Sequence, residues 1–261
     1  MVVSAKLKLR TSYVARITRP RYQALNPFVI YQDPFTSIEG NPNLIPEKVH
    51  AFELGAIYNR FDFKIGYNYK LDPLTAAALR GNGPNNYVLK GINLEKEHYW
   101  FTALSRSFET KWWTSTNTIN ISYRKSIDNT YSFAANKSSP QLYFYSSNTF
   151  NVNDLFNIQV LAWYLGDRYY GLGYERNRSL LTLGIEKTFF KKSLKISVTM
   201  NDILNGFIAS GNYEVGQTEI YYHRTYTSNY ARLMATYRFG KLKKSNYRNT
   251  ETGRSENSRA N

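Results

Sequence analysis

The sequence predicts an all-β protein, an antiparallel up-and-down transmembrane β-barrel of which about ten strands are present. Three observations predict this fold class. Apolar and polar residues alternate with a period of two over most of the 261 residues. Many alternating segments reach the roughly 9–11 residues that a tilted strand needs to cross a bilayer, whereas no apolar run reaches the roughly 18–20 residues of a spanning helix. The connections between the segments alternate between short and long.

The alternation is clearest in the segment 61–72. Phe61 and Phe63 alternate there with Asp62 and Lys64, so the two kinds of side chain point to opposite faces of a strand. The same pattern, weaker in places, predicts the remaining strands and indicates no helix. These further segments are 5–19, 48–58, 88–108, 113–127, 141–152, 154–165, 178–189, 194–201 and 228–239.

The connections fall into two classes, short and long, that alternate along the chain. The short ones are Asn59–Arg60, Glu109–Lys111, Asn151–Asp154 and Lys191–Ser193. The long ones are residues 20–47, 72–87, 128–140, 166–177 and 206–227. A soluble sandwich has no need of this order, whereas an outer-membrane barrel has short periplasmic turns and long extracellular loops. We therefore expect the first strand to run outward and the chain to return to the periplasm.

Aromatic side chains gather at the short-turn ends of the predicted strands. A general preference of aromatic residues for strands would spread them along the whole strand. Their concentration at one end favours an aromatic girdle at the periplasmic interface, where rings with a polar tip lie between lipid and water. The residues of this predicted girdle are Phe61, Trp112, Trp113, Phe156, Phe189, Phe190, Tyr237 and Phe239.

We expect the chain to have two parts, residues 1–240 as the C-terminal portion of the barrel and residues 241–261 as a charged, disordered periplasmic tail. Six Lys or Arg and two Asp or Glu place +4 of the net charge of +15 in the tail. The other basic residues are scattered singly, which argues against a nucleic-acid partner. The first residues contain no apolar h-region, so this sequence predicts no signal peptide.

The composition argues against an enzyme or a metalloprotein. With no Cys in the chain, disulfides, thiolate metal ligands and cysteine nucleophiles are excluded. His50, His98 and His223 have no metal-binding spacing, and no segment resembles the GxSxG motif. Asp202 precedes a long connection, where turn chemistry explains a carboxylate better than catalysis. We therefore predict no catalytic residue, no metal ligand and no cofactor.

The first long connection carries the most specific motif, in the stretches RITRPRYQALNPF and DPFTSIEGNPNLIPEKVHAFELG. Proline fixes φ, and asparagine side chains bond their own backbone, so we expect a stiff loop that folds back over the barrel mouth. The alternative is a loop that only joins two long strands. The motif residues are Arg19, Pro20, Tyr22, Asn26, Pro27, Glu39, Gly40, Asn41, Pro42, Leu44, Pro46 and Glu47.

This motif resembles that of TonB-dependent receptors in the outer membrane protein beta-barrel family, of the type common in Bacteroidota. In that family an Arg-x-x-Arg-Pro-x-Tyr-x-x-Leu-Asn-Pro pattern ends a strand, and Gly-Asn-Pro-x-Leu-x-Pro-Glu leads into the next one. KWW at 111–113, VTMNDILN at 198–205 and ATYRFG at 235–240 are similar to the same family. The resemblance covers nearly the whole chain.

The resemblance implies the C-terminal part of a receptor in the cell outer membrane, whose whole barrel has about 22 strands around a plug. Such receptors import a scarce nutrient, of the siderophore or oligosaccharide class, with energy from the TonB complex acting through the plug. The implied partners are therefore outer-membrane lipid and lipopolysaccharide, an N-terminal barrel half with its plug, TonB, and an imported ligand. No residue is assigned to ligand binding.

A small self-closed barrel that serves as an anchor, adhesin or pore is the alternative. An open ten-strand sheet in lipid would leave two edges of unpaired backbone groups, at a cost of roughly tens of kcal/mol. Closure would produce a narrow lumen in which we expect basic residues to lack partners, which is costly. A wider barrel completed by other strands is therefore favoured. The lumen residues are Lys6, Lys8, Arg10, Lys64, Lys70, Asn120, Arg124, Glu186 and Lys195.

Overall fold

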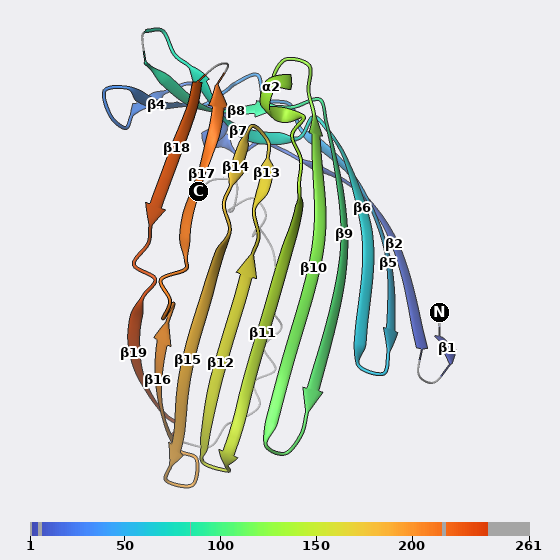
Figure 1. The fold of residues 1–261 in the computed structure, drawn as a ribbon, viewed down its shortest axis with the longest axis vertical. Helices are drawn as coiled ribbons and strands as arrows, with labels where there is room; N and C mark the ends of the chain where they lie inside the picture. The colour runs from blue at the N-terminus through green and yellow to red at the C-terminus, as the bar shows by residue number, and fades with distance from the viewer. Residues whose placement is uncertain (1, 5–6, 84, 216–217, 240–261) are drawn as a thin grey trace.

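The computed structural model consists of one long antiparallel sheet with a smaller cap at one end (Figure 1). It describes residues 2–4, 7–83, 85–215 and 218–239. Within these residues the sheet has eleven strands, and each pairs with its neighbours along the chain once the cap strands are set aside. In sheet order they are β1 (Val2–Ser4), β2 (Leu7–Thr18), β5 (Glu47–Tyr58), β6 (Phe61–Leu71), β9 (Lys96–Glu109), β10 (Trp113–Ile127), β11 (Pro140–Asn153), β12 (Phe156–Leu165), β15 (Arg178–Phe189), β16 (Leu194–Asn201) and β19 (Tyr230–Tyr237).

The short connections lie together at one end of the sheet, which we call the turn end (Figure 1). Asn59 and Arg60 join β5 to β6 with φ values of 43° and 70°. Two consecutive residues with positive φ are typical of the tight turn whose twist matches that of a hairpin. At another turn the Asn153 side chain accepts a hydrogen bond from the Leu155 N–H at 3.0 Å. Local turn chemistry therefore sets the register of these hairpins.

The sheet has one apolar and one polar face. Register shows this directly, since Ile65 lies opposite Leu54 and Thr102 while its neighbour Lys64 points to the other side. The apolar face carries Leu54, Phe63, Ile65, Leu104, Ile119, Ile121, Leu142, Phe144, Leu183, Ile185, Val198 and Leu233. The polar face carries Arg10, Asp62, Lys64, Lys70, Glu97, Arg124, Glu186 and Lys195.

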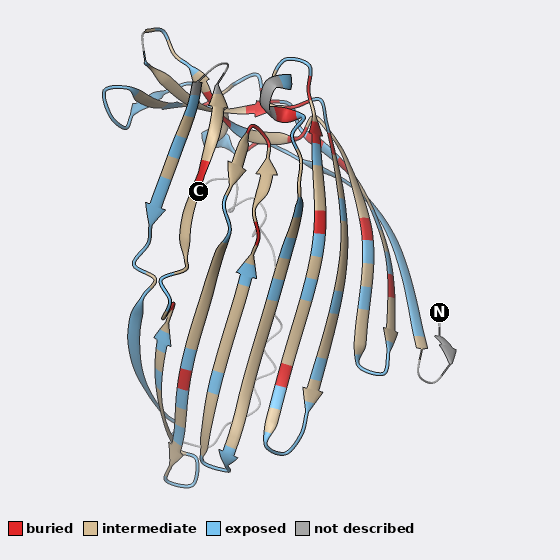
Figure 2. Ribbon diagram, in the orientation of Figure 1, coloured by how far each residue is buried: buried red, intermediate tan, exposed pale blue. Residues whose placement is uncertain are grey.

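The apolar face is not covered by any other part of the described chain. Leu54 is 59% exposed, Ile121 50% and Leu233 73%. Figure 2 shows that most buried residues lie near the cap, whereas the strands are largely intermediate or exposed. An apolar surface of this extent indicates an apolar environment around the sheet.

The cap consists of two four-stranded sheets and α2, at the end opposite the short turns (Figure 1). All its strands come from the long connections. In the first sheet β4 pairs with β8 in parallel, and the other pairs are antiparallel. Its strands are β3 (Val29–Tyr31), β4 (Thr36–Glu39), β8 (Tyr87–Asn93) and β7 (Leu74–Arg80). The second sheet has β13 (Arg168–Tyr170), β14 (Gly173–Glu175), β17 (Ile208–Val215) and β18 (Thr218–Thr225), and the short helices are α1 (Tyr22–Leu25) and α2 (Ser132–Ala135).

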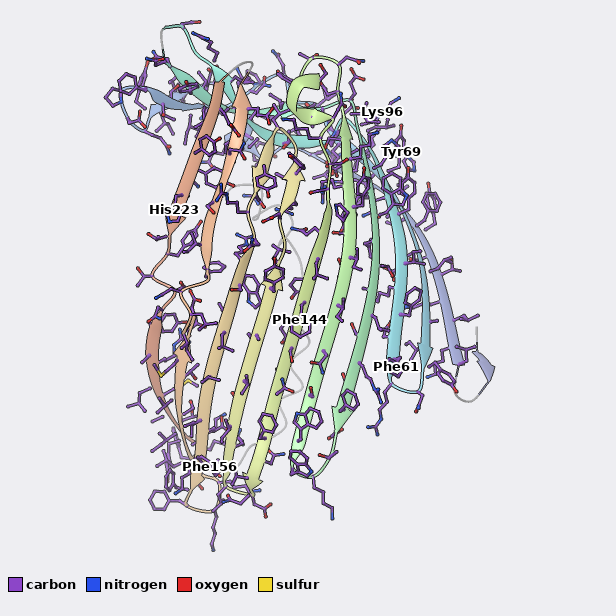
Figure 3. The ribbon with its side chains drawn as sticks, in the orientation of Figure 1. Phe61, Tyr69, Lys96, Phe144, Phe156 and His223 are labelled. Carbon is purple, nitrogen blue, oxygen red and sulfur yellow. The ribbon has the colours of Figure 1, made fainter. Side chains whose placement is uncertain are left out.

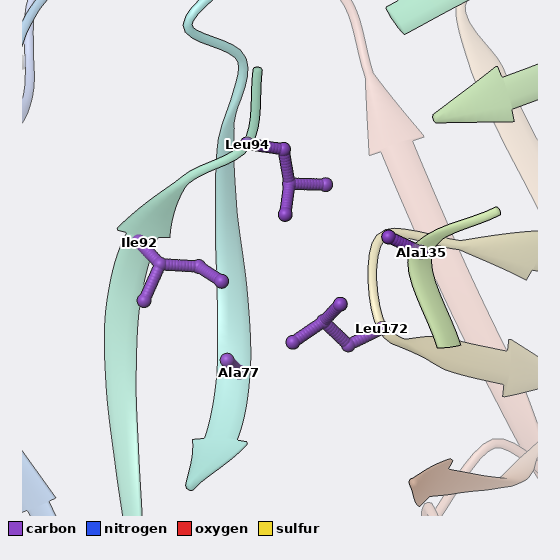
Figure 4. Close-up of a cluster of buried hydrophobic side chains, with 5 residues drawn as sticks. All are labelled: Ala77, Ile92, Leu94, Ala135 and Leu172. Atoms are coloured by element: carbon purple, nitrogen blue, oxygen red, sulfur yellow. The ribbon is translucent and has the colours of Figure 1, made fainter. Parts of the chain in front are cut away.

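A small hydrophobic core holds the cap together. All five side chains of this core are at most 5% exposed (Figure 4). They are Ala77 and Ile92 of the first sheet, Leu94, Ala135 of α2, and Leu172 in the turn between β13 and β14. Burial of these side chains joins segments that are far apart in the sequence. The long connections therefore form one packed unit.

The structure confirms two of the sequence predictions and corrects a third. The fold class is confirmed, and the ten long strands follow the predicted order. The predicted strand 88–108 is wrong as a single unit, because the chain turns at Leu94 and Glu95 and leaves β8 in the cap and β9 in the long sheet. Alternation persists on both sides of that turn, so the pattern alone does not reveal the change of sheet.

The outer strands β1 and β19 do not pair with each other among the described residues, so the long sheet is open. The predicted tail 241–261 and the lumen residue Lys6 lie outside the described residues. Neither of the two described helices has the length and apolar character required to cross a membrane.

Candidate ligand site beneath the cap

The motif loop is shaped by short hydrogen bonds between its asparagines and the backbone. Asn26 Oδ1 accepts the Phe28 N–H at 3.2 Å, and Asn41 Oδ1 accepts the Asn43 N–H at 3.1 Å. These are the turns that asparagine side chains form with the backbone two residues ahead. Gly40 packs so closely on this turn that a Cβ would lie 2.0 Å from the Asn26 carbonyl oxygen. Glycine is therefore required at this position.

Polar contacts tie the loop to the rest of the cap. Asn41 Nδ2 donates to the Gly91 carbonyl at 3.0 Å. The Asn93 side chain accepts from the Ile45 N–H and donates to the Ile45 carbonyl, both at 3.0 Å. Leu44 lies between these bonds and is buried. The loop thus folds back on β8 and is anchored there by hydrogen bonds of its own backbone and of Asn41.

A cavity of about 1200 Å³ lies between the motif loop, β7 and β8. Its wall is mostly apolar, with Phe28, Ile30 and Leu89 among its residues. Arg19, Arg21, Lys90 and Glu39 provide the charges, and Lys90 Nζ lies 3.1 Å from Glu39 Oε1. Six motif residues line the cavity, namely Arg19, Pro20, Asn26, Glu39, Gly40 and Leu44, whereas Tyr22, Pro27, Asn41, Pro42, Pro46 and Glu47 do not.

A network of two buried glutamates and two half-buried cations lies on the polar face near the cap. Lys70 Nζ is 3.5 Å from Glu47 Oε2 and 3.2 Å from Glu97 Oε1. Arg124 also pairs with Glu97, and its guanidinium carbon lies 5.6 Å from the centre of the Tyr170 ring. Because Tyr170 also lines the cavity, the network connects the cavity with the polar face.

Several cations that the sequence places in the lumen have acidic partners on the polar face of the open sheet. Besides Lys70 and Arg124, Arg10 lies 2.5 Å from Asp62 and Lys195 lies 3.0 Å from Glu186. Arg10 and Asp62 reach each other across β5, and the other pairs join neighbouring strands, so the carboxylate and the cation always belong to different predicted segments. The sequence pattern assigns both to one face but does not reveal which residues are opposite each other.

A second pocket, of about 530 Å³, lies on the polar face of β11 and β12. Tyr143, Tyr145 and Trp163 line it together with Arg178 and Phe207. Phe207 contacts Trp163 edge-on, with the ring centres 5.9 Å apart. Sequence reasoning missed this site, although aromatic residues at both odd and even positions of the segment 142–145 indicate a strand that is apolar on both sides.

Asp202 stabilises the connection after β16, as turn chemistry predicts. Its carboxylate accepts the Gly206 N–H at 2.9 Å, the Phe207 N–H at 3.2 Å and the Ser228 hydroxyl at 2.6 Å. Its side chain is completely buried. Among the described residues, no group of three or more His, Cys, Asp or Glu is arranged to hold a metal ion.

Comparison with known proteins identifies the family and the fold. A model of the outer membrane protein beta-barrel family matches residues 3–237. The chain is similar to the siderophore receptor PirA from Pseudomonas aeruginosa, at 13% identity and a TM-score of 0.56, over 90% of this chain and 40% of that chain. A mutant of the ferric enterobactin receptor PfeA from the same organism gives 14% identity and a TM-score of 0.52, over 78% and 33%.

At these sequence identities the two comparisons show a similar fold and nothing further. The chain spans 40% of the length of PirA and 33% of that of PfeA. No curated protein sequence matches the chain.

Proposed function

Because the chain belongs to the outer membrane protein beta-barrel family, we propose that it forms the C-terminal part of an outer-membrane receptor that imports a scarce nutrient. The observation that carries the proposal is the cavity beneath the cap, with its mostly apolar wall and a few charged groups. Its volume of about 1200 Å³ is large enough for a ligand beyond the size of a simple metabolite.

The two faces of the long sheet support a location in the outer membrane. Exposed apolar side chains would face lipid, and the polar face would line a wet interior. Phe61 and Phe156 lie towards the turn end (Figure 3), as a girdle at the periplasmic interface requires. The cap then faces the outside, beside lipopolysaccharide, and is the first part of the chain that an arriving nutrient meets.

The free edges of the sheet support a wider barrel completed by further strands and a plug. Unpaired backbone groups in lipid cost several kcal/mol each, so β1 and β19 require partner strands in the membrane. In the proposed cycle, TonB pulls on the plug and shifts the receptor to a conformation with lower ligand affinity. Import thus depends on a difference in affinity between two states and on no covalent step.

The charges of the cavity indicate the ligand class. Arg19, Arg21 and Lys90 exceed Glu39, so the cavity favours a ligand with anionic or strongly hydrogen-bonding groups. The rings and aliphatic side chains of its wall suit an aromatic or sugar surface. Both a ferric siderophore and an oligosaccharide meet these requirements, and we propose a ligand from one of these two classes.

Uptake by a strain that lacks the gene tests this proposal. Complementation with the wild-type gene is expected to restore uptake of a labelled ferric siderophore under iron limitation, or of a labelled oligosaccharide as the carbon source. The double variant Arg19→Ala/Arg21→Ala is expected to lower that uptake by about tenfold or more, because it removes two charged donors from the cavity.

The control is Arg238→Ala, which removes an exposed arginine at the turn end. It is expected to leave uptake unchanged. Failure of the complemented strain to take up either class above the level of the deletion strain contradicts the proposed function.

The mass of the protein in the outer-membrane fraction tests whether the chain is part of a wider barrel. An immunoblot band far above 30.3 kDa is expected. A band at 30.3 kDa, together with stable single-channel conductance, supports the small self-closed barrel instead.

A further inference from the structure

The apolar face carries a group of basic residues at its cap end. On this face, register places Lys48 and Lys96 on either side of Leu71. One row nearer to the turn end, His50 and His98 lie on either side of Tyr69, and Lys125 lies beyond His98. Figure 3 shows Lys96 and Tyr69 at this end of the sheet. We call Lys48, His50, Lys96, His98 and Lys125 the basic patch.

From the basic patch towards the turn end, the rows of the apolar face are first aromatic and then aliphatic. The next row consists of rings, from β2, β5, β6, β9 and β10, and the rows after it are mainly aliphatic. Neighbouring rings contact each other, with Phe52 and Tyr13 centres 4.8 Å apart and Tyr67 and Trp100 centres 5.2 Å apart. The ring row is Tyr13, Phe52, Tyr67, Trp100 and Tyr123.

The two histidines are held by tyrosines of the ring row. Tyr13 Oη lies 2.8 Å from His50 Nδ1, and Tyr67 Oη lies 2.7 Å from His98 Nδ1. When each hydroxyl donates to Nδ1, the proton of the ring is on Nε2, which is then a donor. Within the described part of the chain no hydrogen bond reaches either Nε2 and no carboxylate pairs with Lys48, Lys96 or Lys125.

The surroundings of the basic patch lack acidic side chains. On the described strands β2, β5, β6, β9 and β10, the positions on the apolar face include no Asp or Glu. Glu97 points to the polar face, where it binds Lys70 and Arg124. Glu95 precedes Lys96, and the Asn129 backbone and side-chain N–H groups bind its carboxylate at 3.1 and 2.9 Å.

The patch is confined to one half of the sheet. On β11, β12, β15, β16 and β19 the described positions of the apolar face near the cap end include no Lys, Arg or His. Leu142, Tyr164, Leu181 and Met200 occupy these positions instead. A general attraction to the membrane surface would not require this asymmetry, so the patch has the character of a local binding site.

We propose that the basic patch binds the phosphorylated headgroup of an outer-leaflet lipid whose acyl chains lie along the ring row and the aliphatic rows. Phosphate oxygens fit the three ammonium groups and the two ring N–H groups by charge and by hydrogen bonding. Neighbouring strands lie about 4.8 Å apart, so the backbones of Lys48 and Lys96 are about 10 Å apart on either side of Leu71, a spacing that a sugar–phosphate headgroup spans. The order of basic, aromatic and aliphatic rows matches the order of parts in such a lipid.

This inference rests on the membrane location in the proposed function and is independent of nutrient import. The test uses protein extracted from the outer membrane in detergent, so only molecules that have reached the membrane are measured. The probe is lipid A with its phosphates, compared with the same lipid after enzymatic removal of phosphate. Binding is followed by native mass spectrometry over a range of lipid concentrations.

The variant Lys48→Gln/Lys96→Gln/Lys125→Gln is expected to bind phosphorylated lipid A about 100-fold more weakly, since each basic residue near an anionic surface contributes about fivefold. The matched control Lys187→Gln/Lys191→Gln/Lys192→Gln removes three lysines near the turn end and is expected to bind like the wild type. Heat-dependent gel mobility shows that each variant is folded, and nutrient uptake by the first variant is expected to be unchanged.

Three results would each overturn the proposal. These are equal binding by the wild type and the first variant, equal losses in both triple variants, and equal binding of phosphorylated and dephosphorylated lipid A. A further arm adds millimolar inorganic phosphate. Displacement of the lipid by free phosphate at that concentration identifies a site for phosphate itself and overturns the assignment to a lipid. If the wild-type protein binds the phosphorylated lipid but its gene does not restore nutrient uptake, the proposed function alone is contradicted.

Discussion

Single residues decide how the long connections leave the sheet, and Asp202 is the best example. It has a φ of 47°, and its buried carboxylate binds two N–H groups and the Ser228 hydroxyl. Asn229 Nδ2 donates to its carbonyl at 3.0 Å. One residue therefore joins the end of β16, the following turn and the approach to β19. A carboxylate at this position has a structural role.

We expect Asp202→Ala to lower the free energy of unfolding by about 3 kcal/mol, because several buried donors would lose a charged acceptor. The control is Asp33→Ala. Asp33 accepts the Phe35 and Thr36 N–H groups, both at 2.8 Å, but its turn is exposed and water replaces the lost acceptor. Urea unfolding in detergent measures both changes. Similar losses in the two variants would show that burial is not the cause.

At the scale of elements, the strands of the long sheet are joined across the polar face by ion pairs. The network of Glu47, Lys70, Glu97 and Arg124 links β5, β6, β9 and β10 near the cap. Glu47 also accepts the Leu74 N–H at 3.2 Å, which connects the network with the cap. Buried charges of this kind are costly to leave without partners.

Lys70→Met is therefore expected to destabilise the protein by about 3 kcal/mol, because Glu47 and Glu97 stay buried and lose a cation. Lys64→Met, on the same strand and the same face, is the matched control. It has no ion pair among the described residues and is expected to cost much less. The double variant Lys70→Met/Glu47→Gln should recover part of the loss. Equal unfolding midpoints for Lys70→Met and Lys64→Met would contradict this account.

In the cap, burial raises the pKa of Tyr222 to about 12, and the neighbouring Tyr213 and Glu175 add to this rise. The unfolded state releases the phenol proton near the ordinary pKa of about 10. Between about pH 10 and about pH 12 the folded state therefore binds more protons, so stability falls as pH rises through this window.

Tyr222→Phe is expected to reduce this fall, measured as the dependence of the urea midpoint on pH. Tyr31→Phe, at a position that is 79% exposed, is the control and should retain the slope of the wild type. An unchanged slope in Tyr222→Phe would mean that other groups cause the alkaline loss of stability.

At the scale of the whole molecule, the cap and the short turns lie at opposite ends of one sheet (Figure 1). In an outer-membrane barrel the long connections are extracellular and the short turns periplasmic. These 261 residues contain no Cys, so a cysteine introduced at either end is the only thiol among them. His223 in β18 and Asp154 in a short turn are both exposed.

His223→Cys is expected to react in intact cells with a thiol reagent that does not cross the outer membrane, because the cap faces outward. Asp154→Cys is expected to react only after the cells are opened. Labelling of Asp154→Cys alone in intact cells would reverse the proposed orientation.

Much of the long sheet was predictable, because alternation and the two classes of connection are local properties. The segments 61–72, 113–127, 178–189 and 194–201 agree with the observed strands to within about one residue at each end. Asp202 was predictable as a turn residue, since the chemistry of a turn depends on its nearest neighbours. The boundary at Leu94 and the pocket around Trp163 were not, because both depend on contacts between segments that are far apart in the sequence.

The sequence by itself determined the fold class, the up-and-down order of the strands and the asparagine turns of the motif loop. These properties follow from a period of two and from the conformational preferences of proline, asparagine and glycine. Only the tertiary structure decided which charges pair, how the long connections combine into a cap, where the cavity lies and which basic residues share a row. Each of these depends on register between strands, which a pattern along one strand does not contain.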